Sequence, residues 1–180
     1  MEKYLRKYRI SSTRLQNWDY GWNAAYFVTI CTHNREWYFG KIESGIMIYS
    51  ELGSIAHKLW TKIPEHFPFV ELSEFVIMPD HIHGIIIINK PHQYGNPVDV
   101  ETQNFASLHP CFSKNRFGPQ SENLASIIRG YKIGVIKYAH EIESGFRWQP
   151  RYHDHIIRDN IEYERITDYI RQNPQKWDRR

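Results

Sequence analysis

The chain has 180 residues, of which 41% are hydrophobic and 24% charged, and this composition fits one globular domain with a substantial core. No apolar run reaches the length of a membrane span, and the charged N-terminus has no hydrophobic secretion segment, so neither a membrane protein nor a secreted one is expected. The net charge of +3 is unevenly distributed, because both ends of the chain are basic and its middle is acidic.

The basic ends and an aromatic content of 15% suit a nucleic-acid partner, because cations neutralise phosphates and aromatic rings stack on bases. By itself this signal is weak, since an isoelectric point near 8.8 is common among proteins that bind no nucleic acid. The two cysteines, Cys31 and Cys111, form no CxxC motif, which argues against a cysteine-ligated zinc site and fits a reducing compartment. We therefore expect a cytoplasmic, nucleoid-associated protein.

The N-terminal half predicts an arm, one helix and several strands. Residues 1–24 show little periodicity and are interpreted as an arm whose cations could contact DNA, or else as a disordered tail; these cations are Arg6, Lys7, Arg9 and Arg14. β-Branched and aromatic residues predict strands over 25–32 and 81–89 and a strand or strand pair over 69–78, and they allow a short strand over 46–50. Apolar spacing predicts a helix over 51–63 that ends at Pro64.

The middle of the chain predicts a long insertion and then the most regular helix. Residues 91–120 contain four prolines without clear periodicity, which suggests a functional loop or insertion. A helix is predicted over 121–142, with an apolar stripe that runs from Leu124 to Ile142. Three cations on or beside its polar side either contact phosphates or simply lie on a solvated face: Arg129, Lys132 and Lys137.

A final helix is predicted between Asp159 and Asn173, after a short strand. Asp159 can cap this helix, Glu162 completes a capping box, and Pro174 disfavours helical backbone at Asn173. The order of strand, helix, strands and two further helices predicts an α+β sandwich, a mostly antiparallel sheet with helices packed on it. The whole chain, 1–180, is interpreted as one domain.

The stretch "HIHGIIII" places two histidines at the start of a buried strand. Side chains alternate between the two faces of a strand, so His81 and His83 point the same way, with Ile85 and Ile87 continuing their face under a helix. Two imidazoles on one face can share a divalent ion where apolar cover ends. The alternative is a pair of ordinary strand-edge histidines, one of them bonded to Asp80, because two ligands alone do not make a metal site.

The final helix carries two further polar groups, side by side on one flank, that could complete a site with the histidines. Tyr169 lies about 100° round from Ile170, and Asn173 follows one turn later on the same flank. A hydroxyl and an amide oxygen therefore stand side by side at the border of the packed face. The alternatives are a half-buried amphipathic tyrosine and a helix C-cap. There is no HxHxH, GxGxxG or GxxxxGK[ST] pattern, which argues against histidine-triad hydrolases and common nucleotide-binding folds.

Several blocks together resemble the HUH single-tyrosine transposases, and most closely their REP-associated tyrosine transposase branch. The blocks are "VIMPDHIH", "DYIRQNP", "RLQNWDYGWNAAYFVTICTHNR", "FGPQSENLASIIRGYK" and "WQPRYHDHIIRD". The resemblance covers nearly the whole chain apart from residues 91–115.

The resemblance implies a ferredoxin-like fold and an enzyme that cleaves and rejoins single-stranded DNA near hairpins. It implies that His81 and His83 bind Mg²⁺ or Mn²⁺ and that Tyr169 attacks the DNA to form a 5′-phosphotyrosine. Asn173 takes the place of a third ligand, where related enzymes usually have glutamine, and an amide oxygen suits a hard cation. His155 is a candidate supporting group, with a structural role at the end of its strand as the favoured interpretation.

Two other functions remain open from the sequence. The protein could be a metal-dependent phosphoesterase that uses water, or a domesticated, inactive protein that binds hairpin DNA. Relatives act as monomers or as dimers that exchange the tyrosine helix, so a monomer or a homodimer is expected.

Overall fold

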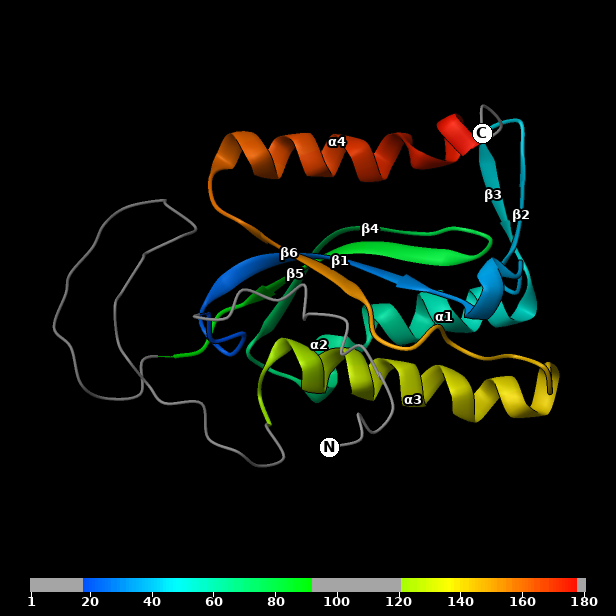
Figure 1. Cartoon of the computed structure of the whole chain (residues 1–180), viewed down its shortest axis with the longest axis horizontal. Coiled ribbons are helices and arrows are strands. Elements are labelled where there is room, and N and C mark those ends of the chain that lie inside the picture. Colours follow the sequence, from blue (N-terminus) through cyan, green and yellow to red (C-terminus); the bar gives the residue numbers. More distant parts are fainter. Residues whose placement is uncertain (1–17, 92–120, 178–180) are drawn as a thin grey trace, which may run out of the picture.

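A computed structural model describes residues 18–91 and 121–177 of the chain. The predictions made for residues 1–17, including those for Arg6, Lys7, Arg9 and Arg14, lie outside the described residues, as does nearly all of the predicted insertion. The described part is built on a four-stranded antiparallel sheet with helices on both faces, and a separate two-stranded hairpin lies beside it (Figure 1). No helix in these two ranges is both long and apolar enough to cross a membrane.

The sheet has the strand order β4 (Val70–Ile77), β5 (His81–Ile88), β1 (Ala24–Cys31) and β6 (His153–Ile157), and each strand runs antiparallel to its neighbours. Helix α1 (Glu51–Thr61) connects β1 to β4, and helix α3 (Leu124–Ile142) connects β5 to β6. Each helix thus joins two parallel strands that are separated by one other strand. This is the split βαβ arrangement of a ferredoxin-like sandwich, so the predicted fold class is confirmed.

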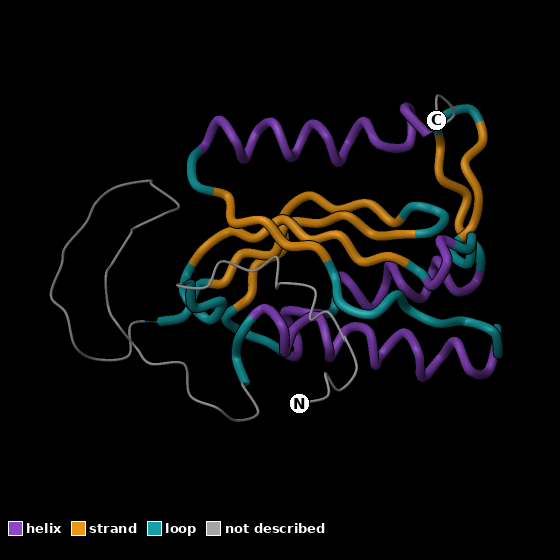
Figure 2. Tube along the Cα trace, viewed as in Figure 1, coloured by secondary structure: helices purple, strands orange, loops and turns teal. Residues whose placement is uncertain are grey.

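Helices α1 and α3 cover one face of the sheet and helix α4 (Asn160–Trp177) covers the other, as Figure 2 shows. The larger core lies on the α1–α3 side, where Ile82, Ile86 and Ile88 of β5 are buried. A smaller core lies under α4, where Ile166 and Ile170 pack on strand side chains that include Ile85 and Ile87. Burial of each such isoleucine contributes roughly 1.5–3 kcal/mol, and together they hold α4 on the histidine-bearing face.

Helix α4 begins as the sequence predicts and ends later. The carboxylate of Asp159 accepts the Glu162 backbone N–H at 2.8 Å, which confirms the N-terminal cap. The other half of the predicted capping box differs, because the carboxylate of Glu162 accepts the backbone N–H of Arg158 rather than that of Asp159. The predicted end near Asn173 is wrong, because Pro174 lies inside the helix, which continues to Trp177. The proline removes one helical hydrogen bond. Beyond it in the chain, the ring of Trp177 packs beside His81.

Other differences from the predicted elements are local. The hairpin of β2 (Gly40–Glu43) and β3 (Ile46–Tyr49) includes one strand that was not predicted. Pro64, predicted to end the helix over 51–63, lies in the first turn of a second, short helix, α2 (Ile63–His66). On α3 the apolar stripe stops at Ala139, since Tyr138 and Ile142 are exposed.

The described end of the predicted arm packs onto the sheet. Trp18 and Tyr20 lie against the larger core. The indole N–H of Trp18 donates to the hydroxyl of Tyr26 at 3.1 Å, and that hydroxyl donates to the carbonyl of Trp22. Burial raises the pKa of Tyr26 and keeps the hydroxyl protonated for this bond. The segment that leads into β1 is therefore part of the folded domain.

Candidate active site

The two histidines point toward each other from the same face of β5. Their ring centroids are 4.5 Å apart, and their Nε2 atoms are separated by 3.0 Å. Both side chains are almost fully buried. Strand alternation alone predicts a separation of about 7 Å along the strand, so the rings converge beyond what the backbone imposes. The cause of this convergence lies in the groups that hold the outer nitrogens.

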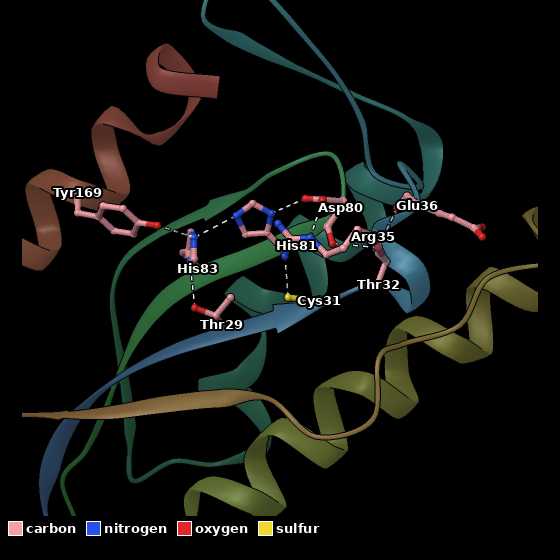
Figure 3. A network of polar contacts seen from close by, with 9 residues as sticks. All are labelled: Thr29, Cys31, Thr32, Arg35, Glu36, Asp80, His81, His83 and Tyr169. Atoms are coloured by element: carbon pink, nitrogen blue, oxygen red, sulfur yellow. Dashed lines mark hydrogen bonds and ion pairs between the residues drawn. The ribbon is translucent and has the colours of Figure 1, made fainter. Parts of the chain in front are cut away.

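Asp80 and Thr29 orient the two rings by contacts at their Nδ1 atoms, whereas the Nε2 atoms face each other (Figure 3). The Nδ1–H of His81 donates to the carboxylate of Asp80, and the hydroxyl of Thr29 is bonded to Nδ1 of His83 at 2.8 Å. Thr29 and His83 face each other in the register of β1 and β5. A carboxylate can only accept a hydrogen bond, so the Nδ1 of His81 carries the proton and its Nε2 presents a lone pair.

A second charge fixes Asp80 in turn. The Nε of Arg35 lies 2.8 Å from the other carboxylate oxygen, and Arg35 also donates to the sulfur of Cys31 at 2.9 Å. Asp80 is only 4% exposed, so its negative charge depends on these two partners. The chain of contacts from Arg35 through Asp80 to His81 therefore sets the orientation of one imidazole from the surface of the protein inward.

Tyr169 reaches the imidazole of His83 from helix α4. Its hydroxyl lies 3.2 Å from Nε2 of His83, although the two residues are 86 positions apart in the sequence. The ring packs edge-on against Phe27 and His83, with centroid distances of 6.1 and 5.3 Å, and Phe27 itself stacks on His83. Tyr169 as a whole remains 39% exposed, so the protein orients the side chain while part of it stays in contact with solvent.

Asn173 lies between two contacts that α4 makes with the histidines. It follows Tyr169 by four residues and precedes Trp177 by four, and the Trp177 ring lies 5.9 Å from that of His81. Residues four apart lie on one face of a helix. Asn173 is also 3% exposed. Asn173 is therefore buried on the stretch of α4 that runs between these two contacts, and its role as a ligand stays a prediction.

The donor set suits a divalent cation. The two Nε2 atoms lie 3.0 Å apart, the distance of a hydrogen bond in which one nitrogen donates its proton to the other. Without that proton both nitrogens would present a lone pair to one position, and about 3.0 Å is also the separation of adjacent ligands around an octahedral ion whose bonds are about 2.1 Å long, as for oxygen on magnesium. Within residues 18–91 and 121–177, no three His, Cys, Asp or Glu side chains form a metal-binding group. A further ligand from these described residues would therefore be an amide or a hydroxyl oxygen, such as those of Asn173 and Tyr169.

His155, a candidate for supporting the histidine pair, instead contacts the first turn of α4. Its Nε2 lies 2.8 Å from a carboxylate oxygen of Glu162, in the first turn of α4 and about two turns before Tyr169. Burial raises the pKa of Glu162, but hydrogen bonds from the Arg158 N–H and from His155 outweigh it and lower the pKa overall. The contact joins β6 to the start of α4, which matches the structural interpretation of this histidine.

The three cations predicted to contact phosphates lie on α3, across the sheet from the histidine pair (Figure 1). Arg129 and Lys137 are exposed there. Lys132 donates instead to the backbone carbonyls of Gln149 and Arg151 at 2.9 and 2.7 Å. Burial lowers the pKa of Lys132 to about 8. Lys132 thus fastens the segment before β6 to α3, which the helical pattern alone could not reveal.

Sequence reasoning overlooked four of the groups that shape this site: Thr29, Arg35, Phe27 and Trp177. Thr29 and Phe27 alternate along β1 on the α4 face, and this parity was visible in the sequence. The register that sets them opposite β5 was not. Arg35 and Trp177 come from a turn and from a helix end, and no spacing rule connects them to the histidines.

Comparisons with known proteins agree with the fold and with the motifs. No family model matches the sequence. An uncharacterized protein of Haemophilus influenzae is 38% identical over 168 residues, which cover 93% of this chain and 89% of the relative. A second protein of the same organism, provisionally assigned as a REP-associated tyrosine transposase, is 32% identical over 112 residues. That match covers 62% of this chain, which spans about half the length of that relative.

The chain belongs to one family with the uncharacterized H. influenzae protein. A solved structure described as a REP-associated tyrosine transposase bound to a REP hairpin has a TM-score of 0.56 and 19% identity with it, and covers 92% of this chain and 73% of the other. The chain resembles the REP-associated tyrosine transposases. The solved transposase supports the shared fold, and the provisional one supports the sequence resemblance.

Proposed function

We propose that the protein is a metal-dependent transposase or endonuclease that cleaves and rejoins single-stranded DNA near hairpins. The observation that carries the proposal is the contact between Tyr169 and His83, at 3.2 Å, beside two imidazole nitrogens 3.0 Å apart. The hydroxyl of a partly exposed tyrosine next to a candidate cation site is the arrangement needed to attack a phosphodiester. The resemblance to transposases supports DNA as the substrate, and the relative solved with a REP hairpin supports a hairpin as its form.

In the proposed reaction Tyr169 is the nucleophile. Its hydroxyl loses its proton as its oxygen bonds to the scissile phosphorus, the bond from phosphorus to the 3′ oxygen breaks, and that oxygen takes up a proton and leaves as a 3′-OH. The product is a 5′-phosphotyrosine, and a 3′-OH of another strand reverses the step to rejoin DNA without an external energy source. Phe27 and His83 hold the tyrosine ring, so little orientational freedom is lost when DNA binds.

His81, His83 and Asn173 are the proposed ligands of Mg²⁺ or Mn²⁺. Asp80 and Thr29 keep both imidazoles oriented with Nε2 toward the shared position. What a bound divalent ion supplies is withdrawal of charge from a phosphate oxygen, which makes a neutral-pH attack by a weak nucleophile such as tyrosine feasible. The amide of Asn173 contributes a neutral oxygen, so the site keeps a net positive charge for phosphate.

We further propose that the tyrosine acts on the histidine pair of its own chain. Strand β6 ends at Ile157 and α4 begins at Asn160, so only two residues join them. Packing of Ile166 and Ile170 on the sheet holds α4 over the same chain's β5. A monomer therefore contains all the proposed groups, and exchange of the helix between two chains is not required.

The test is to incubate the full chain with end-labelled hairpin DNA and Mn²⁺ and to look for a covalent protein–DNA adduct on a denaturing gel. The wild type should form an adduct, and Tyr169→Phe should form none. Tyr163→Phe is the matched control, because Tyr163 lies on the same helix but its hydroxyl is bonded to Ser73 on β4. The control should still form the adduct.

Each contrary outcome favours one alternative. DNA cleavage that survives in Tyr169→Phe would replace the proposal with a phosphoesterase that uses water. A wild type that binds hairpins but neither cleaves them nor forms an adduct in Mn²⁺ or Mg²⁺ would indicate an inactive hairpin-binding protein. Adduct formation that continues in EDTA would refute the metal dependence alone.

A further inference from the structure

Trp37 is an exposed tryptophan on a turn that is otherwise firmly held. Its side chain is 63% exposed. On one side of it, the hydroxyl of Thr32 donates to the carbonyl of Glu36 at 2.8 Å. On the other, the backbone N–H of Phe39 donates to the carbonyl of Pro79 at 3.0 Å, and the Phe39 ring is fully buried. A turn fixed at both ends thus presents an indole to solvent, where its apolar surface gains nothing from burial in the fold.

The exposed ring is the outer end of a row of rings that leads to the candidate active site. Trp37 lies 5.9 Å from Trp177, and Trp177 lies 5.9 Å from His81. His81 is followed by His83 at 4.5 Å, and His83 by Tyr169 at 5.3 Å. The row comes from three distant parts of the chain: the turn before β2, the start of β5 and the length of α4. Sequence proximity therefore does not explain it.

We propose that Trp37, backed by Trp177, is a stacking platform for an unpaired base next to the DNA phosphate that Tyr169 attacks. The proposal rests on the proposed function, since it takes the histidine pair as the position of that phosphate. Aromatic rings beside a backbone-binding site are a common means of holding single strands, because every base offers a flat face to a ring. Trp37 gives the flanking strand one such surface on the protein's exterior.

Charge beside the two tryptophans favours a nucleic acid over an apolar protein segment. Lys176 is exposed next to Trp177, and Arg35, two residues before Trp37, keeps 44% of its side chain exposed while it pairs with Asp80. The acid beside Trp37, Glu36, accepts a hydrogen bond from the hydroxyl of Tyr38. A strand whose base lies on Trp37 would carry its phosphates past these cations on the way to the histidines. The occupant is therefore a flanking single strand, and the paired stem of the hairpin lies elsewhere.

The test is equilibrium binding by the full chain in EDTA, so that no cleavage occurs. Two hairpins with the same stem are used, one with a single-stranded flank of four nucleotides and one without. Trp37→Ala should weaken binding of the flanked hairpin by about tenfold to a hundredfold, the expected loss for one base–ring stack. Its affinity for the hairpin without a flank should equal that of the wild type. Tyr138→Ala, which removes an exposed ring on α3, should change neither affinity.

A fluorescent base analogue in the flank gives a second measurement. 2-Aminopurine at the stacked position should lose fluorescence on binding to the wild type and keep it with Trp37→Ala, while Trp37→Phe should restore part of the quenching. Equal losses on both hairpins, or quenching that persists in Trp37→Ala, would overturn the platform. Adduct formation by the wild type on the flanked hairpin tests the proposed function separately: flank-dependent binding without any adduct would refute the function and leave the platform standing.

Discussion

Replacement of Asp80 by asparagine is the sharpest test of how this site is organised. Asp80 is buried, accepts a hydrogen bond from His81, and forms an ion pair with Arg35 at 2.8 Å. Asparagine has the same shape and can still accept the bond from His81. It has no charge for Arg35, so Asp80→Asn removes the electrostatic part of the orientation while it leaves the packing unchanged.

The structure allows two magnitudes to be estimated. A charge-assisted hydrogen bond contributes about 1.5–3 kcal/mol to stability. The Arg35 side chain is 44% exposed, and solvent screening reduces the expected loss to about 1–2 kcal/mol, or about 2–8 °C in melting temperature for a chain of this size. Loss of a carboxylate partner behind a metal-binding histidine typically weakens metal affinity by about 10- to 100-fold.

The assay is Mn²⁺ titration by calorimetry, followed by thermal unfolding with and without the ion. At a Mn²⁺ concentration one hundred times the wild-type Kd, binding should stabilise the wild type by about 2.7 kcal/mol. The variant, with affinity weakened by about 10- to 100-fold, should gain only about 0.4–1.4 kcal/mol at the same concentration. Asp168→Asn makes the same chemical change at an exposed position of α4 and should behave as the wild type.

The two magnitudes are independent, so each can fail separately. If Asp80→Asn lowers stability but binds Mn²⁺ with wild-type affinity, Asp80 supports the fold and does not orient a ligand. If the wild type binds no divalent ion at all in the absence of DNA, the proposal that the histidine pair is a preformed metal site is refuted.

Three further changes test other parts of the fold. Glu162→Gln should cost about 1 kcal/mol at pH 7, and the difference from the wild type should be lost as pH falls through the lowered pKa of Glu162, because a lowered carboxyl pKa stabilises the fold only above it; a constant difference in acid unfolding would contradict this. Gly84→Ala should cost about 3 kcal/mol or more in urea unfolding, because a Cβ there would lie 2.4 Å from the buried Trp60 ring, and a neutral effect would mean that the ring can shift. Lys132→Met should cost about 1–2 kcal/mol through its two carbonyl contacts and leave the salt dependence of hairpin binding unchanged, whereas a smaller salt slope would restore its predicted phosphate contact.

The sequence was most informative where a single periodicity decides the outcome. Alternation along "HIHGIIII" correctly predicted that the histidines share a face with Ile85 and that Ile82 faces the opposite layer. The cap at Asp159 was also predicted correctly, because capping depends only on residues three apart in the sequence. Pro174 was misleading, because a local rule about the residue before proline gave way to the packing of Trp177 beyond it.

What the sequence by itself determined is the inventory of the site: two histidines on one face of a strand, and a tyrosine and an asparagine one turn apart on a helix flank. These follow from the periods of a strand and a helix, which are properties of the backbone. Only the tertiary structure decided that the two sets meet, because the contact between Tyr169 and His83 depends on strand register and on the isoleucines that seat α4. The contact of Thr29 with His83 depends on the same register, whereas the pairing of Arg35 with Asp80 and the row of rings that ends at Trp37 depend on how a turn and the end of α4 pack beside the start of β5.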